Sequence, residues 1–119
     1  MARTFALSAF LALCLAAPGL AHPPSYVPGT EDVPLMPGLE TVDGSALIFD
    51  KPQGRIVEVS ASGALKRSDV LQFYAASLPA LGWTKAGRQA YQREGERLSF
   101  EFTGADGHLI VGILLEPEY

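Results

Sequence analysis

Alternating apolar and polar residues predict a series of short β-strands from residue 45 onward. Leu98 and Phe100, for example, share one face of an expected strand, while Ser99 and Glu101 share the other. Such alternation, or a short apolar run bounded by turn residues, predicts five strands: residues 45–49, 55–62, 89–93, 97–103 and 108–116. Glycine-containing turns separate several of them, and residues 104–107 are typical of a β-hairpin.

Between the second and third of these strands, residues 68–81 have the apolar spacing of one amphipathic helix. The expected apolar stripe consists of Val70, Phe73, Tyr74, Ser77, Leu78 and Leu81. We expect Ser68 to cap the N-terminus and Gly82 to follow the C-terminus, with Pro79 weakening the last turn. Because Phe73 lies at the centre of the stripe, we expect it to be a core residue.

The element order along the chain is therefore β-β-α-β-β-β. This order predicts an α+β fold, in which residues 44–119 form one two-layer domain. We expect an antiparallel sheet with the helix packed on one of its faces.

The last expected strand is apolar on both faces. Leu109, Val111, Ile113 and Leu115 lie on one face, and Ile110 and Leu114 lie on the other. A strand with one solvated face alternates apolar with polar residues, so we expect the second face to be covered as well.

Residues 22–43 form an expected extended arm that could provide this cover. The arm contains five prolines, which disfavour both helix and central strand: Pro23, Pro24, Pro28, Pro34 and Pro37. It also contains several large apolar residues, which are uncommon in a solvated linker: Val33, Leu35, Met36 and Leu39. We expect the arm to lie across the second face, and the alternatives are a partner protein or a second copy of the chain.

Residues 1–21 have the features of a cleavable secretory signal peptide. A positive residue, Arg3, precedes an apolar run that is too short to cross a membrane. Gly19 and Ala21, which follow this run, are small residues of the kind found just before a signal-peptidase cleavage site. We predict cleavage after Ala21, export to the periplasm and a mature chain that begins at His22. Lipidation of Cys14 and a buried N-terminal helix are the alternatives.

Charge and composition disfavour several classes of function. The net charge is −4, and without a cluster of basic residues we expect no binding to nucleic acid. The one cysteine lies within the predicted signal peptide, so the mature chain would have neither disulfides nor a cysteine nucleophile. Neither a Gly-x-Ser-x-Gly elbow nor a phosphate-binding glycine loop occurs. We therefore expect no enzymatic activity and no cofactor.

Two groups of residues could still carry chemistry. If His22 is the mature N-terminus, its amine and imidazole together with His108 could form a three-nitrogen copper site, as in histidine-brace proteins. Glu94 and Glu96 flank a turn and could bind a sugar or a cation, although a solvated hairpin tip is the simpler interpretation.

Residues 69–83 resemble a motif of small exported proteins in Gram-negative bacteria. The motif is Phe-Tyr-x-x-x-Leu-Pro-x-x-Gly-Trp, here Phe73 to Trp83, and residues 32–38 and 93–96 also resemble that family. The resemblance implies a periplasmic location and a strand–helix–strands domain, and it brings no catalytic residues. In this motif, Trp83 is expected to pack against the end of the helix.

Taken with the predicted export, these features lead us to expect a non-enzymatic periplasmic protein that binds another envelope protein or a second copy of itself. The alternative is a small-ligand or metal carrier, with copper bound by His22 and His108.

Overall fold

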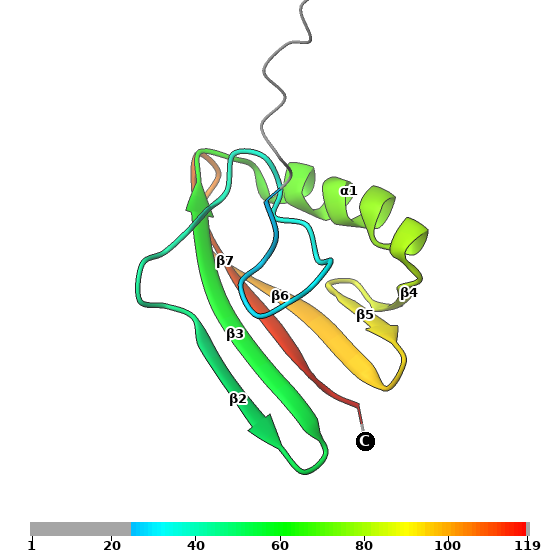
Figure 1. Ribbon diagram of the computed structural model, residues 1–119. Helices are drawn as coiled ribbons and strands as arrows, with labels where there is room; N and C mark the ends of the chain where they lie inside the picture. The colour runs from blue at the N-terminus through cyan, green and yellow to red at the C-terminus, as the bar shows by residue number, and fades with distance from the viewer. Residues whose placement is uncertain (1–24, 119) are drawn as a thin grey trace, which may run out of the picture.

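The computed structural model describes residues 25–118 and has a mostly antiparallel open sheet of seven strands with one α-helix (Figure 1). The α+β fold class is therefore confirmed. The elements in chain order are β1 (Glu40–Thr41), β2 (Leu47–Lys51), β3 (Gly54–Gly63), α1 (Arg67–Ser77), a 3-10 turn (Pro79–Leu81), β4 (Thr84–Gly87), β5 (Ala90–Arg93), β6 (Glu96–Ala105) and β7 (His108–Pro117). The predicted signal peptide and its cleavage site lie outside the described residues.

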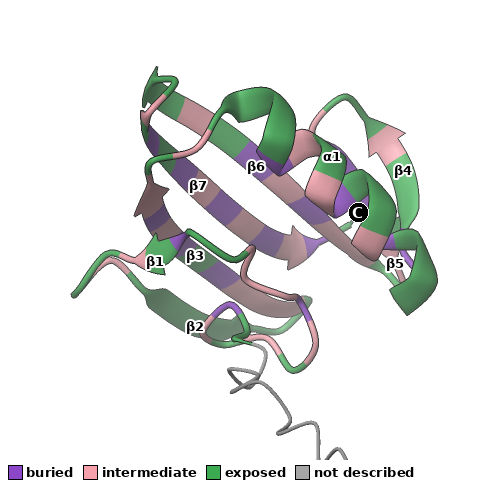
Figure 2. Cartoon of the chain, turned by 90° about the horizontal axis from the view of Figure 1, so that it is seen from above, coloured by how far each residue is buried: buried purple, intermediate pink, exposed green. Residues whose placement is uncertain are grey.

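The strand β7 occupies the middle of the sheet although it follows every other strand in the chain. The spatial order is β1-β3-β7-β6-β5-β4, and β2 also pairs with β3. In register, Ile113 of β7 lies opposite Val59 of β3 on one side and Phe100 of β6 on the other. Buried residues alternate with exposed or partly buried ones along β7, as the purple bands in Figure 2 show.

Two strands, β1 and β4, were not predicted. β1 has only two residues, and β4 has four, with a shift in register between Lys85 and Gly87. Such short segments show too few alternations to stand out in the sequence.

The helix begins at Arg67, so the prediction that Ser68 caps it is wrong. The N-cap residue is Lys66, whose side chain makes no capping hydrogen bond. The amide of Arg67 instead donates to the Asp106 carboxylate, 3.0 Å away, at the tip of the β6–β7 hairpin. A residue distant in sequence thus satisfies a helix amide, and local capping motifs cannot reveal such a contact.

The apolar stripe of the helix is narrower than the sequence predicts. Val70, Tyr74 and Leu78 are buried, whereas Phe73 is only partly buried and Leu81 is 38% exposed. After Ser77 the chain leaves the α-helix, a 3-10 turn follows, and Gly82 takes a left-handed conformation at φ 91°. This change in geometry turns Leu81 away from the face that Leu78 shares with the core.

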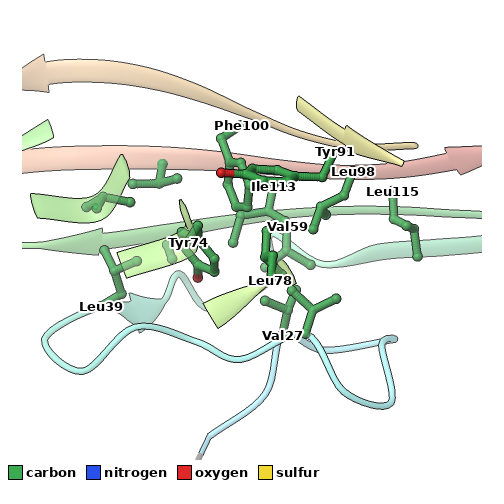
Figure 3. Packing of buried hydrophobic residues seen from close by; sticks show 14 of the residues in the cluster. Val27, Leu39, Val59, Tyr74, Leu78, Tyr91, Leu98, Phe100, Ile113 and Leu115 are labelled. Atoms are coloured by element: carbon green, nitrogen blue, oxygen red, sulfur yellow. The ribbon is translucent and has the colours of Figure 1, made fainter. Parts of the chain in front are cut away.

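The arm lies on the same face of the sheet as α1, so the expectation that it covers the opposite face is wrong (Figure 1). Val27, Val33 and Leu39 are at most 5% exposed and belong to the same core cluster as the buried helix residues. In Figure 3, Val27 and Leu39 extend from the arm toward the sheet, close to Tyr74 and Leu78. An 11-residue helix is too short to cover a face that includes three ten-residue strands, and the arm covers the remainder.

No helix within residues 25–118 is long and apolar enough to cross a membrane.

Candidate functional site

The sheet face opposite α1 and the arm, here called the open face, is the first candidate site. Successive residues of a strand point to opposite faces of the sheet. The strand residues that precede and follow each buried core residue in sequence therefore lie on the open face. Its members on the four main strands are Leu47, Phe49 and Lys51 (β2), Gly54, Ile56, Glu58, Ser60 and Ser62 (β3), Arg97, Ser99, Glu101, Thr103 and Ala105 (β6), and His108, Ile110, Gly112, Leu114 and Glu116 (β7).

The open face is more apolar than a solvated sheet face requires. Leu47 is 55% exposed, and Phe49 and Ile110 are each 44% exposed. Ile56 and Leu114 add two further large side chains that are partly buried among their neighbours. No segment within residues 25–118 covers these side chains, because the arm and α1 lie on the other face.

Gly112 lies near the centre of the open face, opposite Ser60 on one side and Glu101 on the other. A Cβ at this position would be in ordinary van der Waals contact with the Glu101 Cβ at 3.7 Å, so a small side chain would fit there without a clash.

Four carboxylates and two basic side chains flank these apolar residues: Glu40, Glu58, Glu101 and Glu116, with Lys51 and Arg97. Glu58 and Glu101 are exposed on the open face, and Glu40 lies opposite Ser62 at its edge. An apolar surface with acidic neighbours is complementary to an apolar surface that carries basic residues.

A cleft of about 760 Å³ at the junction of the arm, the helix end and the β5–β6 turn is the second candidate site. Both signs of charge line it: Glu31, Asp32, Glu94 and Glu118 are acidic, and Arg55 and Arg93 are basic. The uncharged lining residues are Leu81, Gly82, Thr84, Gln92 and Gly95.

Arg93 lines this cleft, and its guanidinium donates three hydrogen bonds. It donates to both carboxylate oxygens of Asp32, at 2.7 and 3.0 Å, and to the carbonyl oxygen of Leu81 at 2.9 Å. It also stacks over the ring of Trp83, 4.3 Å from the ring centroid. Arg93 therefore joins the arm to the end of the helix and to β5.

The ion pair changes the titration of both partners. The hydrogen bond from Arg93 holds the pKa of Asp32 below its ordinary value of 3.8, and the same bond raises the pKa of Arg93. Both groups remain charged at neutral pH. Neither provides a proton for acid–base chemistry.

Arg55 makes a second clamp beside the first. It pairs with Glu96 at 3.2 Å and donates to the carbonyl oxygen of Gly29 in the arm at 3.0 Å. Glu96 is therefore held in an ion pair, whereas Glu94 remains exposed at the turn. The two carboxylates do not act together, and the interpretation of both as a solvated hairpin tip fits only Glu94.

The described residues give no contact between the two proposed copper ligands. His108 is exposed at the start of β7, and His22 lies outside the described residues. Within residues 25–118, no three histidine, cysteine or carboxylate side chains come close enough to hold a metal ion.

Sequence reasoning did not find the Asp32–Arg93 pair, whose members are 61 residues apart. Both residues lie in segments that resemble the exported family, but neither segment indicates a contact with the other. Comparison of the chain with family models, curated proteins and solved structures finds no match.

Proposed function

We propose that this chain is a non-enzymatic periplasmic protein that binds another envelope protein through its open face. The observation that carries the proposal is the exposure of Leu47, Phe49 and Ile110 on a face that the rest of residues 25–118 leaves uncovered. Leu47, Phe49, Ile56 and Leu114 lie on neighbouring strands at one end of this face, and Ile110 lies toward the other end, opposite Ser62. Exposed apolar residues gathered on one face of a sheet are typical of interaction sites. The neighbouring carboxylates favour a partner whose apolar surface is flanked by basic residues.

The test begins with tagged protein recovered from its own cell envelope. A co-purified protein is identified, purified and titrated against wild type and two variants. Ile110→Lys places a charge within the open face, and we expect about tenfold weaker binding because the interface would have to bury that charge without a partner. Tyr26→Ser is the control, because Tyr26 is 49% exposed but lies in the arm. Equal binding by both variants, or the absence of any specific partner, would contradict the proposal.

A small-ligand carrier is the second candidate, and the cleft around Arg93 is the observation that favours it. Its volume is sufficient for a small molecule. However, Asp32, Glu96 and backbone carbonyl groups already occupy both guanidinium groups. A compound that raises the Tm of wild type, but not that of a Thr84→Trp variant with a filled cleft, would establish the carrier function.

Copper carriage by His22 with His108 belongs to the same alternative. We expect only weak, non-specific binding when correctly processed protein is titrated with Cu(II). Sub-micromolar affinity that is lost in both His22→Ala and His108→Ala would instead establish a metal site.

A further inference from the structure

The strand β2 forms an unprotected edge of the sheet. Each of its five residues pairs with a residue of β3, and no other strand within residues 25–118 pairs along its far side. All five residues are exposed, as the green colour of β2 in Figure 2 shows. Three of them are large and apolar: Leu47 is 55%, Ile48 is 53% and Phe49 is 44% exposed.

The edge strand at the other end of the sheet, β4, is also largely exposed, but its sequence and its pairing differ from those of β2. It has four residues, a lysine and an irregular register between Lys85 and Gly87. Proteins use such short, charged or bulged edges to prevent pairing with other chains. β2 has a regular register over its whole length, and its charged residues, Asp50 and Lys51, stand only at its end.

We propose that β2 pairs antiparallel with β2 of a second copy of this chain, about a two-fold axis at Phe49. Pairing over all five residues places the axis at the central residue, so that the two Phe49 rings lie side by side on the open face. Most homo-oligomers are closed two-fold dimers, and pairing of identical edge strands satisfies this symmetry. The two open faces would then form one continuous surface.

Charge complementarity favours a second copy as the occupant. In this register, Lys51 of one copy lies opposite Leu47 of the other, and Leu47 lies opposite Glu58 on β3. Two strand spacings separate the Cα atoms of Lys51 and Glu58 by about 10 Å, a distance that an extended lysine and a glutamate can bridge across Leu47. Symmetry produces this pair twice.

The size of the interface indicates a reversible dimer. Five paired residues on each side bury less surface than the roughly 1,200 Å² of a typical stable complex. The net charge of −4 on each chain also opposes association. We therefore expect the dimer to form with increasing protein concentration.

Single-cysteine variants test the axis directly. In a Cys14→Ala background, we expect Phe49→Cys to form a disulfide-linked dimer under mild oxidation, because residues on the axis face each other. Ile110→Cys is the matched control, since Ile110 is also 44% exposed and lies on the open face. Equal cross-linking of the two variants would overturn the proposal.

Charge exchange tests the register by analytical ultracentrifugation. We expect Lys51→Glu and Glu58→Lys each to weaken dimerisation by about tenfold, because each change replaces two attractive pairs with two repulsive ones. The double variant should restore the wild-type dissociation constant. Wild-type protein that stays monomeric at every concentration, or a double variant without rescue, would overturn the proposal. The proposed function does not depend on this result, because Ile110→Lys measures partner binding separately.

Discussion

At the scale of single residues, Tyr74 connects the three parts of the core. Its ring stacks on Phe100 of β6 with centroids 4.4 Å apart, and its hydroxyl donates to the carbonyl oxygen of Pro34 in the arm at 2.8 Å. Burial raises the pKa of Tyr74 to about 12, so the hydroxyl keeps the proton that it donates. Through Tyr74, the helix contacts the sheet with the aromatic ring and the arm with the hydroxyl group.

The exposure of Leu78 and Leu81 leads to a prediction about stability. Leu78 is fully buried, whereas Leu81 is 38% exposed beyond the end of the helix. We expect Leu78→Ala to lower the free energy of unfolding by about 2–5 kcal/mol, the usual cost of a cavity at a buried leucine. Leu81→Ala should cost less than about 1 kcal/mol. Urea denaturation of the two variants measures both values, and similar losses would contradict the described helix end.

The helix spacing was sufficient to identify Val70, Tyr74 and Leu78 as core residues. It could not show that Phe73 is only partly buried, because Phe73 and Tyr74 both fit a stripe of this width. Tyr74 is buried between Phe100 of the sheet and Pro34 of the arm, and the spacing of residues in the helix does not predict where either neighbour lies.

At the scale of elements, the arm is held beside the helix by side chains as well as by burial. Arg93 binds Asp32, and Arg55 binds the carbonyl oxygen of Gly29. The close approach of the Gly38 carbonyl to Gly63 at the end of β3 requires glycine there, because a Cβ at Gly63 would collide with that oxygen. The arm is consequently a fixed layer of the fold rather than a linker.

The Asp32–Arg93 pair predicts a pH dependence of stability. The pKa of Asp32 is lower in the folded protein than the ordinary value of 3.8, so its contribution is complete above that value. As the pH falls below about 3.8 and through the lower folded pKa, the carboxylate is protonated and the contribution is lost. Because Asp32 is 41% exposed, we expect a modest effect.

Urea denaturation at about pH 6 and about pH 3 measures this effect. Asp32→Asn should lose less stability than wild type between the two conditions. Glu31→Gln is the control, because this neighbouring carboxylate is exposed, and it should retain the wild-type difference. The same pH dependence in all three proteins would contradict a role for the pair.

Sequence alternation predicted the longer strands because each repeats the pattern several times, as β6 does from Leu98 to Phe102. It could not determine which face the arm covers. The arm is irregular, and its apolar residues could pack on either side of the apolar strand β7.

At the scale of the whole molecule, the arm provides part of the only core cluster in the described residues. Deleting residues 25–39 would expose the strand residues that Val27, Val33 and Leu39 cover and would remove about 5–9 kcal/mol of gross apolar burial. We expect the shortened protein to be strongly destabilised and to bind a dye for exposed apolar surface. A deletion variant that is equally stable and does not bind the dye would show that the arm covers nothing.

Processing of the N-terminal segment is a separate prediction. We expect protein recovered from the periplasm to begin at His22, because the apolar run ends in the small residues before it. Intact-mass analysis decides this. A mass that includes residues 1–21, or an acyl chain on Cys14, would contradict it.

The candidate sites were less predictable than the fold. The open face follows from strand alternation, but its exposure depends on where the arm packs. The cleft depends on Asp32 and Arg93, and only the folded chain brings these residues together.

The central position of β7 has a consequence for the order in which the molecule can be built. A chain leaves the ribosome, or crosses a translocation pore, with its N-terminal part first. β3 and β6 do not pair with each other and are joined only through β7, which follows both of them. The hydrogen bond from the Arg67 amide to Asp106 also cannot form until the β6–β7 turn has been synthesised. The emerging chain therefore cannot complete its sheet until its last strand is available.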